Sequence, residues 1–317
     1  MPPKILVIVG PTASGKTRLA VELAHEWNGE VVSADSMQVY RRMDIGTAKP
    51  TAEEMDGIPH HMIDVADPGE DFSAARYVEM ASACVDGILA RGRLPIVAGG
   101  TGLYIDSLLS GRTFAAFSPD SPLRGELEAE LARRGGAAML EELARVDPET
   151  AARLHPNDHK RIVRALEVFR STGRTISQHD RETRALPPRY DALTIGLTFR
   201  ERADLWARID RRVDQMARDG LEAEVRGLLS SGLPRTCTAM QAIGYKEFVA
   251  AVDGQISWKE AEELVKLRSR QYAKRQLTWF KRERDVRWLN LPDFGNDVSL
   301  VLDRIIEDCV GAGIVLQ

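Results

Sequence analysis

The stretch KILVIVGPTASGKT, residues 4–17, decides the fold class. Its first part, Lys4–Val9, is a nearly continuous run of branched apolar side chains, which is typical of a buried strand in a parallel sheet. The following segment, Lys16–Trp27, places apolar residues at helical spacing. The turn between them matches the phosphate-binding pattern G-x-x-x-x-G-K-S/T, in the strand, turn and helix context that the pattern requires. We therefore expect a phosphate-binding α/β protein.

Further strand-like and helix-like segments alternate after this start. Glu30–Ala34 and Leu94–Ala98 are short apolar runs, and between them Phe72–Ala90 has helical periodicity with Ser73 at the N-cap position. Strands that alternate with helices predict a doubly wound parallel sheet. The predicted fold is α/β: a P-loop NTPase-like parallel sheet core with a helical insertion domain and a helical C-terminal region.

The insertion is predicted from a change of pattern. Charge-rich helical sequence begins after the loop Ser118–Pro122, and a strand-like apolar run returns at Ala192–Leu197. Helices placed between two sheet-like segments indicate an insertion into one core rather than a second domain in tandem. The predicted domains are a discontinuous P-loop core, residues 1–115 and 188–317, and a helical insertion domain, residues 116–187.

Composition excludes several classes of protein. A chain of 317 residues with 44% apolar residues has ample material for a core, and it is too apolar for a disordered protein. We find no apolar run of about 18 residues, so no membrane-spanning helix is predicted. Cys84, Cys237 and Cys309 stand far apart, which supports neither a disulfide framework nor a cysteine zinc site. The N-terminus has no signal-peptide pattern, and we expect a cytoplasmic protein.

The net charge of −4 hides two basic segments. Residues 153–184 hold eight Lys and Arg against four Asp and Glu, and residues 266–287 hold nine against two, which leaves −15 for the rest of the chain. Two solvated basic helix faces are one explanation. Two clusters in an otherwise acidic chain favour the other, a local surface that binds a polyanion.

The phosphate-binding loop consists of Gly10, Pro11, Thr12, Ala13, Ser14, Gly15, Lys16 and Thr17. Its glycines let backbone N–H groups turn toward phosphate oxygens, Lys16 adds a point charge, and the Thr17 hydroxyl is suited to bind Mg²⁺. A phosphoryl-transfer enzyme of this class usually holds Mg²⁺ with an acidic residue at the end of a core strand, yet the strand at 94–98 ends in Gly-Gly-Thr-Gly. The bound phosphate need not be the group that is transferred.

Polar side chains follow two of the predicted strands, where open α/β sheets bind their ligands. Asp35 leads the segment Asp35-Ser36-Met37-Gln38, and its carboxylate is suited to be a general base or, alternatively, a helix cap. The Gln38 amide is suited to pair with the edge of a base. Thr101, within Gly99-Gly-Thr-Gly102, offers a hydroxyl to an anion, although a tight turn would explain the glycines equally well.

Nine motifs in this order resemble one known family over nearly the whole chain. They are GPTASGKT at 10–17, SADSMQVY at 33–40, GTAKP at 46–50, PHHM at 59–62, GGTGLY at 99–104, HPNDHKRIVRALEV at 155–168, DRRVDQM at 210–216, AIGYKE at 242–247 and KRQLTWF at 274–280. The chain is similar in these segments to the bacterial tRNA dimethylallyltransferases.

This resemblance implies transfer of a dimethylallyl group from dimethylallyl diphosphate to N6 of adenosine 37, in tRNAs that read codons beginning with U. The products would be N6-dimethylallyladenosine and diphosphate, and the metal would be Mg²⁺, bound through Thr17. Asp35 would be the general base. The residues acting on the diphosphate would be Ser14, Lys16, Thr17, Thr101 and Arg212.

The resemblance also implies contact with the anticodon stem-loop of tRNA, and we expect a monomer. The residues that would contact tRNA are Asp35, Ser36, Met37, Gln38, Thr101, His159, Lys160, Arg161, Ile162, Val163, Lys274, Arg275 and Gln276. Helical spacing places Lys266, Arg270 and Lys274 on one face and predicts that Leu267, Leu277 and Phe280 pack inward. Tyr272 and Trp279 are left open between the core and RNA bases.

Three other functions stay open on the sequence alone. An adenylate dimethylallyltransferase acting on a free nucleotide would have the same core but would need neither the insertion nor the basic C-terminal helix. A P-loop small-molecule kinase would need ATP and a phosphoryl acceptor. A noncatalytic RNA-binding protein could use a nucleotide in the P-loop as a switch.

Overall fold

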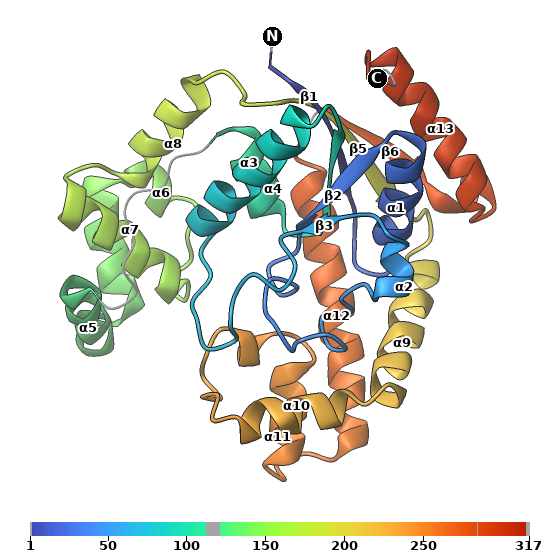
Figure 1. Ribbon diagram of the computed structural model, residues 1–317. Coiled ribbons are helices and arrows are strands. Elements are labelled where there is room, and N and C mark those ends of the chain that lie inside the picture. The colour runs from blue at the N-terminus through green and yellow to red at the C-terminus, as the bar shows by residue number, and fades with distance from the viewer. Residues whose placement is uncertain (1, 112–120, 284, 315–317) are drawn as a thin grey trace. The chain divides into compact units, whose positions relative to one another are not determined.

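The structure of the protein is a computed structural model that describes residues 2–111, 121–283 and 285–314 (Figure 1). Its contacts divide the chain into two compact units. The first consists of Met1–Leu109 with Arg189–Gln317, and the second of Ser110–Pro188. The predicted boundary between residues 115 and 116 lies outside the described residues, as does most of the predicted loop Ser118–Pro122.

Six parallel strands form the sheet of the first unit, in the order β3-β2-β4-β1-β5-β6. Their bounds are β1 Lys4–Val9, β2 Gly29–Ala34, β3 His60–His61, β4 Leu94–Gly99, β5 Asp191–Thr198 and β6 Val286–Asn290. Val9 at the end of β1 pairs with Gly99 of β4 on one side and with Gly196 of β5 on the other. The phosphate-binding loop therefore leaves the middle of the sheet, and the predicted parallel α/β core is confirmed.

Side chains alternate between the two faces of the central strand. Leu6 and Ile8 belong to an apolar cluster with α1 (Lys16–Glu26) and α13 (Val298–Gly311). Ile5, Val7 and Val9 belong to a second cluster, with α3 (Ala74–Ala90) and α4 (Gly102–Leu109). Helices thus cover both faces of the sheet (Figure 1). The cap predicted at Ser73 is confirmed, because its side chain accepts a hydrogen bond from the backbone N–H of Arg76 at 3.1 Å.

A third apolar cluster joins the C-terminal helices to the segment that follows β2. Its helices are α9 (Arg202–Arg218), α10 (Leu221–Ser230), η1 (Ala239–Gln241), α11 (Tyr245–Val252) and α12 (Trp258–Phe280). Val39, Tyr40 and Met43, which follow β2, are fully buried among them. Two short helices, α2 (Ala52–Met55) and η2 (Leu291–Phe294), complete this unit. The chain between β2 and β3 is therefore held by side chains that come from some 200 residues further on.

The second unit is helical in its described part. Its helices are α5 (Pro122–Val146), α6 (Pro148–Ala151), α7 (His159–Thr172) and α8 (Ile176–Ala185). Leu127, Met139 and Leu143 of α5 pack against the apolar face of α7. Gly135 interrupts α5 with a φ of 77°, a conformation that glycine adopts at no steric cost. None of the helices described here is long and apolar enough to cross a membrane.

Two strands at the edges of the sheet were not predicted. β3 has only two residues, too few for any periodicity. β6, with the sequence VRWLN, lies in a segment that the sequence analysis assigned to helix. Only Leu289 of this strand is fully buried, because β6 is an edge strand paired with β5 alone.

Candidate active site

The phosphate-binding loop turns tightly between β1 and α1. Gly15 caps α1 in the left-handed conformation, with φ 88°, so the first N–H groups of the helix point out of the turn. The Lys16 Nζ donates to the carbonyl oxygens of Gly10 at 3.0 Å and Pro11 at 2.7 Å. The pKa of Lys16 is lowered to about 7, chiefly by burial and also by the charge of Arg212, with Asp35 acting in the opposite direction. A bound anion would shift this lysine back toward its charged form.

Two hydroxyl groups of this loop fit an oxyanion. Ser14 is buried, and its Oγ has no hydrogen-bond partner among the described residues. Such a buried donor normally finds an acceptor, and a phosphate oxygen would supply one. Thr17 lies half-buried in the first turn of α1. Its hydroxyl is therefore available to Mg²⁺ in the way that the P-loop motif uses it.

Asp35 follows β2 directly and faces a cavity. Its Oδ1 accepts hydrogen bonds from the backbone N–H groups of Met37 at 2.8 Å and Gln38 at 3.3 Å. Oδ2 has no hydrogen bond to a described residue, so one oxygen orders the turn and the other is free to receive a proton. Thr101 lies beside it, because its Oγ1 accepts a hydrogen bond from the backbone N–H of Ser36 at 3.1 Å. The structure brings these two predicted residues together.

The cavity has a volume of about 300 Å³ and two kinds of wall. Polar groups of Thr12, Asp35, Ser36 and Arg212 form one part of it. Apolar side chains form a second part, namely Met37, Ile209, Val213, Met216, Ala242, Ile243 and Val265, and Gly46, Thr47, Gln241, Ser269, Tyr272 and Arg275 complete the lining. A largely apolar cavity with a few convergent polar groups is the usual form of a small-molecule site.

Arg212 reaches this cavity from α9. Its Nη1 donates to the Oγ1 of Thr12 at 3.2 Å and its Nη2 to the carbonyl oxygen of Ala48 at 3.4 Å. Burial lowers the pKa of Arg212, and the carboxylates of Asp35 and Glu54 act in the opposite direction. The guanidinium group therefore links the phosphate-binding loop to the segment between β2 and β3.

Helix α12 holds the phosphate-binding loop from the other side. The Oε1 of Gln276 accepts a hydrogen bond from the backbone N–H of Thr12 at 2.8 Å, and its Nε2 donates to the carbonyl oxygen of Gly100 at 3.0 Å. A Cβ atom at position 100 would lie only 2.0 Å from this Nε2, so a side chain there would displace the Gln276 amide. Gln276, predicted to contact tRNA, is buried and has its amide in use between two loops.

Tyr272 is a cavity residue whose role the sequence left open. Its pKa is raised to about 12, chiefly by burial and also by the charge of Asp35, while hydrogen bonds with Thr101 and Gln276 act in the opposite direction. Its ring lies 5.6 Å from the guanidinium carbon of Arg275, which also lines the cavity. The phenol stays protonated at neutral pH. Because it lines the cavity, it belongs to the site rather than to the core.

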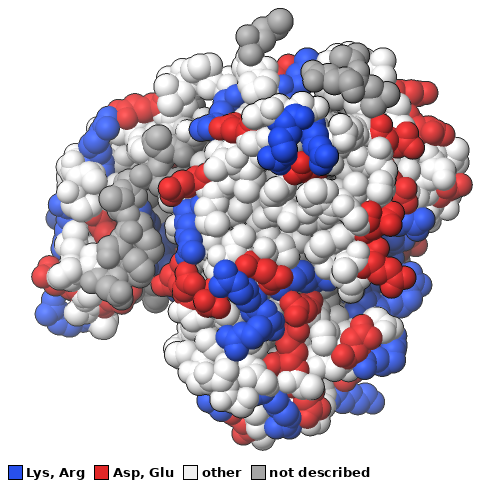
Figure 2. Space-filling model, viewed as in Figure 1, with Lys and Arg blue, Asp and Glu red and all other residues white. Residues whose placement is uncertain are grey.

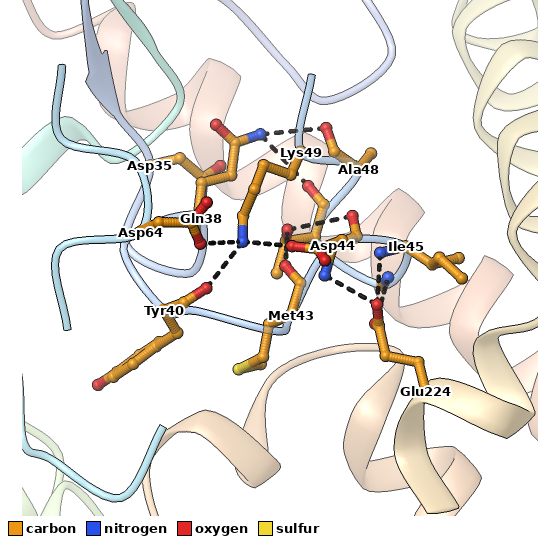
Figure 3. Close-up of polar contacts among 12 residues, drawn as sticks. Asp35, Gln38, Tyr40, Met43, Asp44, Ile45, Ala48, Lys49, Asp64 and Glu224 are labelled. Carbon is orange, nitrogen blue, oxygen red and sulfur yellow. Dashed lines mark hydrogen bonds and ion pairs between the residues drawn. The ribbon is translucent and has the colours of Figure 1, made fainter. Parts of the chain in front are cut away.

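A buried lysine organises the segment after β2 (Figure 3). The Nζ of Lys49 donates to Asp44 Oδ1 at 2.5 Å, to Asp64 Oδ1 at 2.6 Å and to the carbonyl oxygen of Tyr40 at 2.9 Å. The lysine side chain is only 5% exposed, whereas Asp44 and Asp64 are 60% and 48% exposed, so a buried ammonium group is held by carboxylates that reach solvent. This lysine belongs to the motif at residues 46–50, and no role was predicted for it.

Glu224 of α10 holds the same segment from outside (Figure 3). Its Oε2 accepts hydrogen bonds from the backbone N–H groups of Asp44 and Ile45, both at 2.8 Å, and its Oε1 accepts one from Gly46 at 3.1 Å. The hydroxyl of Tyr245 donates to Oε1 at 2.5 Å. Because Gly46 lines the cavity, this carboxylate fixes part of the cavity wall. No local sequence pattern signals such a contact.

The amide of Gln38 has internal partners. Its Oε1 accepts a hydrogen bond from Ser33 Oγ at 3.1 Å, and its Nε2 donates to the carbonyl oxygens of Ala48 at 3.1 Å and Thr47 at 3.4 Å. A contact between this amide and a base edge, which the sequence suggested, would require at least one of these hydrogen bonds to be exchanged.

Basic residues of the second unit line a surface groove of about 480 Å³. They are Arg124, Arg153, Lys160, Arg161 and Arg164, with Asp180 as the one acidic residue of the lining. His159, Lys160 and Arg161 are exposed at the start of α7. The side chains of Ile162 and Val163 are buried in the core of this unit, so the contact with tRNA predicted for these two residues would have to use their backbone.

The basic face of α12 is partly neutralised. Lys266 forms ion pairs with Asp214 at 2.7 Å and Glu263 at 2.8 Å, and Arg270 pairs with Asp210 at 3.0 Å. Lys274 and Arg275 are exposed. Figure 2 shows acidic and basic side chains mixed in small groups over one face of the molecule.

Apolar positions of α12 follow the prediction in part. Phe280 is buried and Leu277 packs against the main core cluster, as expected. Leu267 was predicted to pack inward and is 42% exposed, so that prediction is wrong. Trp279 is partly exposed, and its Nε1 donates to Asp106 at 2.7 Å.

A phosphate-binding loop beside an acidic residue, an arginine and an apolar cavity, all at the carboxyl edge of a parallel sheet, defines a P-loop α/β enzyme fold. The chain matches the IPP transferase family over residues 38–283 and belongs to that family. It is therefore a transferase, and the family that the sequence motifs resembled is confirmed.

Curated relatives are similar over nearly their full length. A tRNA dimethylallyltransferase of Acetivibrio thermocellus is 47% identical over 94% of this chain and 95% of its own. One of Symbiobacterium thermophilum is 49% identical over 96% and 95% of the two chains.

Solved structures that are similar to this chain come from the same kind of enzyme as these relatives. A tRNA isopentenylpyrophosphate transferase from Bacillus halodurans, 44% identical, superposes with a TM-score of 0.72 and covers 98% of both chains. A eukaryotic dimethylallyltransferase described as acting on tRNA is 29% identical, with a TM-score of 0.83 over 98% of this chain and 80% of its own.

Proposed function

We propose that this protein transfers a dimethylallyl group from dimethylallyl diphosphate to N6 of adenosine 37 of tRNA, in the anticodon loop of tRNAs that read codons beginning with U. One observation carries the proposal: Asp35 and Arg212 both line a cavity beside the P-loop, and much of the remaining lining is apolar. A diphosphate with a short hydrocarbon tail matches this combination of walls. The family and the names of the relatives support it.

The P-loop would hold the diphosphate as a leaving group. As the bond between the allylic carbon and oxygen breaks, its electron pair leaves with the diphosphate and negative charge grows there. Donors aimed at that charge stabilise the transition state more than the ground state. The loop N–H groups, the Ser14 hydroxyl, Lys16 and Arg212 would supply them. Mg²⁺, held by Thr17 and phosphate oxygens, would add charge neutralisation when bound.

Asp35 would act on the nucleophile. N6 of adenine is a weak nucleophile because its lone pair is delocalised into the ring. As N6 forms its bond to the allylic carbon it must lose a proton, and Oδ2 of Asp35 is an acceptor without a hydrogen bond to any described residue. Thr101 would help to place this carboxylate, because its Oγ1 holds the backbone N–H of Ser36. The step balances: the bond from N6 to the allylic carbon forms as the carbon–oxygen bond breaks, the N6 proton goes to Asp35 and the electron pair leaves with the diphosphate anion.

The substrate base would have to leave the stack of the anticodon loop to enter the cavity, as enzymes that act on a base generally require. Exposed His159, Lys160 and Arg161 in the second unit, and Lys274 and Arg275 on α12, would contact tRNA. Phosphate contacts of this kind fix the position of an RNA without reading its sequence. We further propose that the enzyme is a cytoplasmic monomer.

The test is an assay with dimethylallyl diphosphate, Mg²⁺ and a tRNA that carries A36-A37-A38. We expect prenylated tRNA and release of diphosphate. AMP replaces tRNA in a parallel reaction, and product with AMP alone would assign the protein to the free-nucleotide enzymes. Phosphoryl transfer from ATP to a small acceptor, without prenylation, would assign it to the kinases.

A further inference from the structure

A groove of about 620 Å³ lies between the start of α9 and α12 in the first unit. None of the residues that line it lines the cavity beside the P-loop. Helix α12 contributes to both, since Tyr272 and Arg275 face the cavity and Lys274 and Leu277 face the groove. The groove is therefore a separate site that shares one rigid helix with the proposed active site.

Two large apolar side chains are exposed in this groove. Trp206 of α9 is 43% exposed and Leu267 of α12 is 42% exposed, above a floor that includes the buried Leu205 and Ala273. A single exposed apolar residue needs no explanation, but two that share one groove mark a binding surface. The indole of Trp206 has no hydrogen-bond or ring partner among the described residues.

The charged lining of this groove is entirely positive. Arg200 and Arg270 are neutralised by ion pairs with Asp293 and Asp210. The other three cations, Arg202, Lys274 and Lys281, are exposed and have no ion-pair partner in the described part of the chain. Positive charge therefore faces a free aromatic ring.

We propose that this groove binds a segment of the tRNA strand outside the reacting nucleotide, with one base stacked on Trp206 and phosphates held by Arg202, Lys274 and Lys281. An aromatic platform edged by cations is the chemistry that binds single-stranded nucleic acid. The proposal rests on the proposed function, which supplies tRNA as the strand.

Three features favour an RNA strand over other anions. The site is concave, so an inserted base fits it and a flat bilayer surface does not. Lys274 and Lys281 are seven helical positions apart, about 10 Å along α12, which suits successive phosphates better than one phosphate group. The same helix carries Tyr272 and Arg275 in the proposed active site, where the tRNA would react.

Binding of the tRNA to the full-length protein tests the proposal. We expect Trp206→Ala to weaken tRNA affinity about tenfold and to raise the KM for tRNA, because one stacked base is lost. Trp206→Tyr, which keeps a ring, should restore most of the affinity. Leu300→Ala, at a residue 51% exposed on α13 and outside the groove, is the matched control and should bind as wild type. The KM for dimethylallyl diphosphate and the melting temperature should not change in any of them.

A second variant tests the proposed contacts with tRNA phosphates. Lys281→Ala should lower the slope of log affinity against log salt concentration by about one, because one counterion fewer is released. An unchanged slope, or wild-type affinity in Trp206→Ala, would overturn the proposal. The fluorescence of Trp206, taken as the difference between wild type and Trp206→Ala, gives a further test. If AMP quenches it at the same concentrations as tRNA does, the groove is a site for a free nucleotide and the proposal is overturned.

The two proposals fail in distinguishable ways. If the wild-type protein prenylates tRNA and Trp206→Ala binds tRNA normally, the groove proposal falls and the proposed function stands. If the wild-type protein binds tRNA through Trp206 but gives no prenylated product, the proposed function falls and the groove as an RNA site stands.

Discussion

Gln276 accepts a hydrogen bond at 2.8 Å from the backbone N–H of Thr12, a residue 264 positions earlier in the chain. Through its other amide atom the same side chain holds the carbonyl oxygen of Gly100, next to Thr101. The P-loop and the glycine-threonine loop, which leave neighbouring strands, are thus fixed to each other by one buried side chain. If both loops bind the diphosphate, their spacing is part of the catalytic geometry, and a helix far along the sequence determines it.

For Gln276→Ala we expect kcat to fall at least tenfold with the KM for tRNA nearly unchanged. The variant leaves the Thr12 N–H and the Gly100 carbonyl buried without partners, at a cost of about 1–3 kcal/mol each, and loosens both loops. Steady-state kinetics with tRNA and dimethylallyl diphosphate measure kcat and the KM for tRNA separately. A rise in the KM for tRNA at constant kcat would instead support the tRNA contact predicted from the sequence.

For Asp35→Asn we expect turnover to fall by about two decades or more, with tRNA affinity close to that of the wild type. Asparagine keeps an oxygen that can accept from the N–H groups of Met37 and Gln38, so the turn persists while the base is lost. Single-turnover rates and equilibrium binding of the same tRNA give the two quantities. Near-normal turnover would show that Asp35 is only a cap.

Lys16 gives a prediction about protons. Its pKa of about 7 means that it is mostly neutral at pH 8 in the free protein. A diphosphate bound beside it favours the ammonium form, so binding at pH 8 should take up close to one proton, and this uptake should vanish below about pH 6. Titration calorimetry of dimethylallyl diphosphate without tRNA, in buffers of different ionisation enthalpy, measures the uptake.

Lys16→Met is the control for that experiment. It has no titratable group at this position, so the difference between wild type and variant removes the protons taken up or released by the diphosphate itself. Equal proton uptake by both proteins would mean that Lys16 is already charged in the free protein.

Glu224 gives a prediction about the cavity wall. In Glu224→Gln an amide NH₂ must face N–H and O–H donors, so we expect a loss of about 2–4 kcal/mol in the free energy of unfolding and a lower kcat/KM. Tyr245→Phe removes only one of the four hydrogen bonds and should have a smaller effect on both. Hydrogen exchange of residues 43–49 should become faster in Glu224→Gln. Exchange as slow as in the wild type would show that this carboxylate does not stabilise the loop.

The sequence predicted the elements whose pattern is local. β1 and α1 follow from the period of their own side chains, and Asp35 and Thr101 follow from strands that end at one edge of a sheet. Their catalytic roles, like that of Arg212, stay predictions. Ile162 was predicted to contact RNA because of its place in a motif; its side chain is buried on the inner face of α7, and the contact stays a prediction.

The features that were not predicted depend mostly on contacts between distant parts of the chain. The contact of Gln276 with Thr12 and that of Glu224 with the turn at Asp44 join segments at least 180 residues apart. Side-chain periodicity carries no information about such pairs. β6 escaped prediction because it is a short edge strand with one fully buried residue, so its apolar signal is weak.

Arg212 gives the last prediction. Two different nitrogens of its guanidinium group reach Thr12 and Ala48, a geometry that a single ammonium group cannot reproduce. For Arg212→Lys we therefore expect kcat to fall about a hundredfold, close to the effect of removing one donor from a developing anion, although the positive charge remains. The loss should be in the chemical step, so single-turnover rates should fall in parallel with kcat, and tRNA affinity should change little. Arg218→Lys, at an exposed position in the last turn of the same helix, is the control and should behave as wild type. Normal single-turnover rates in Arg212→Lys would reduce the role of this residue to one of charge alone.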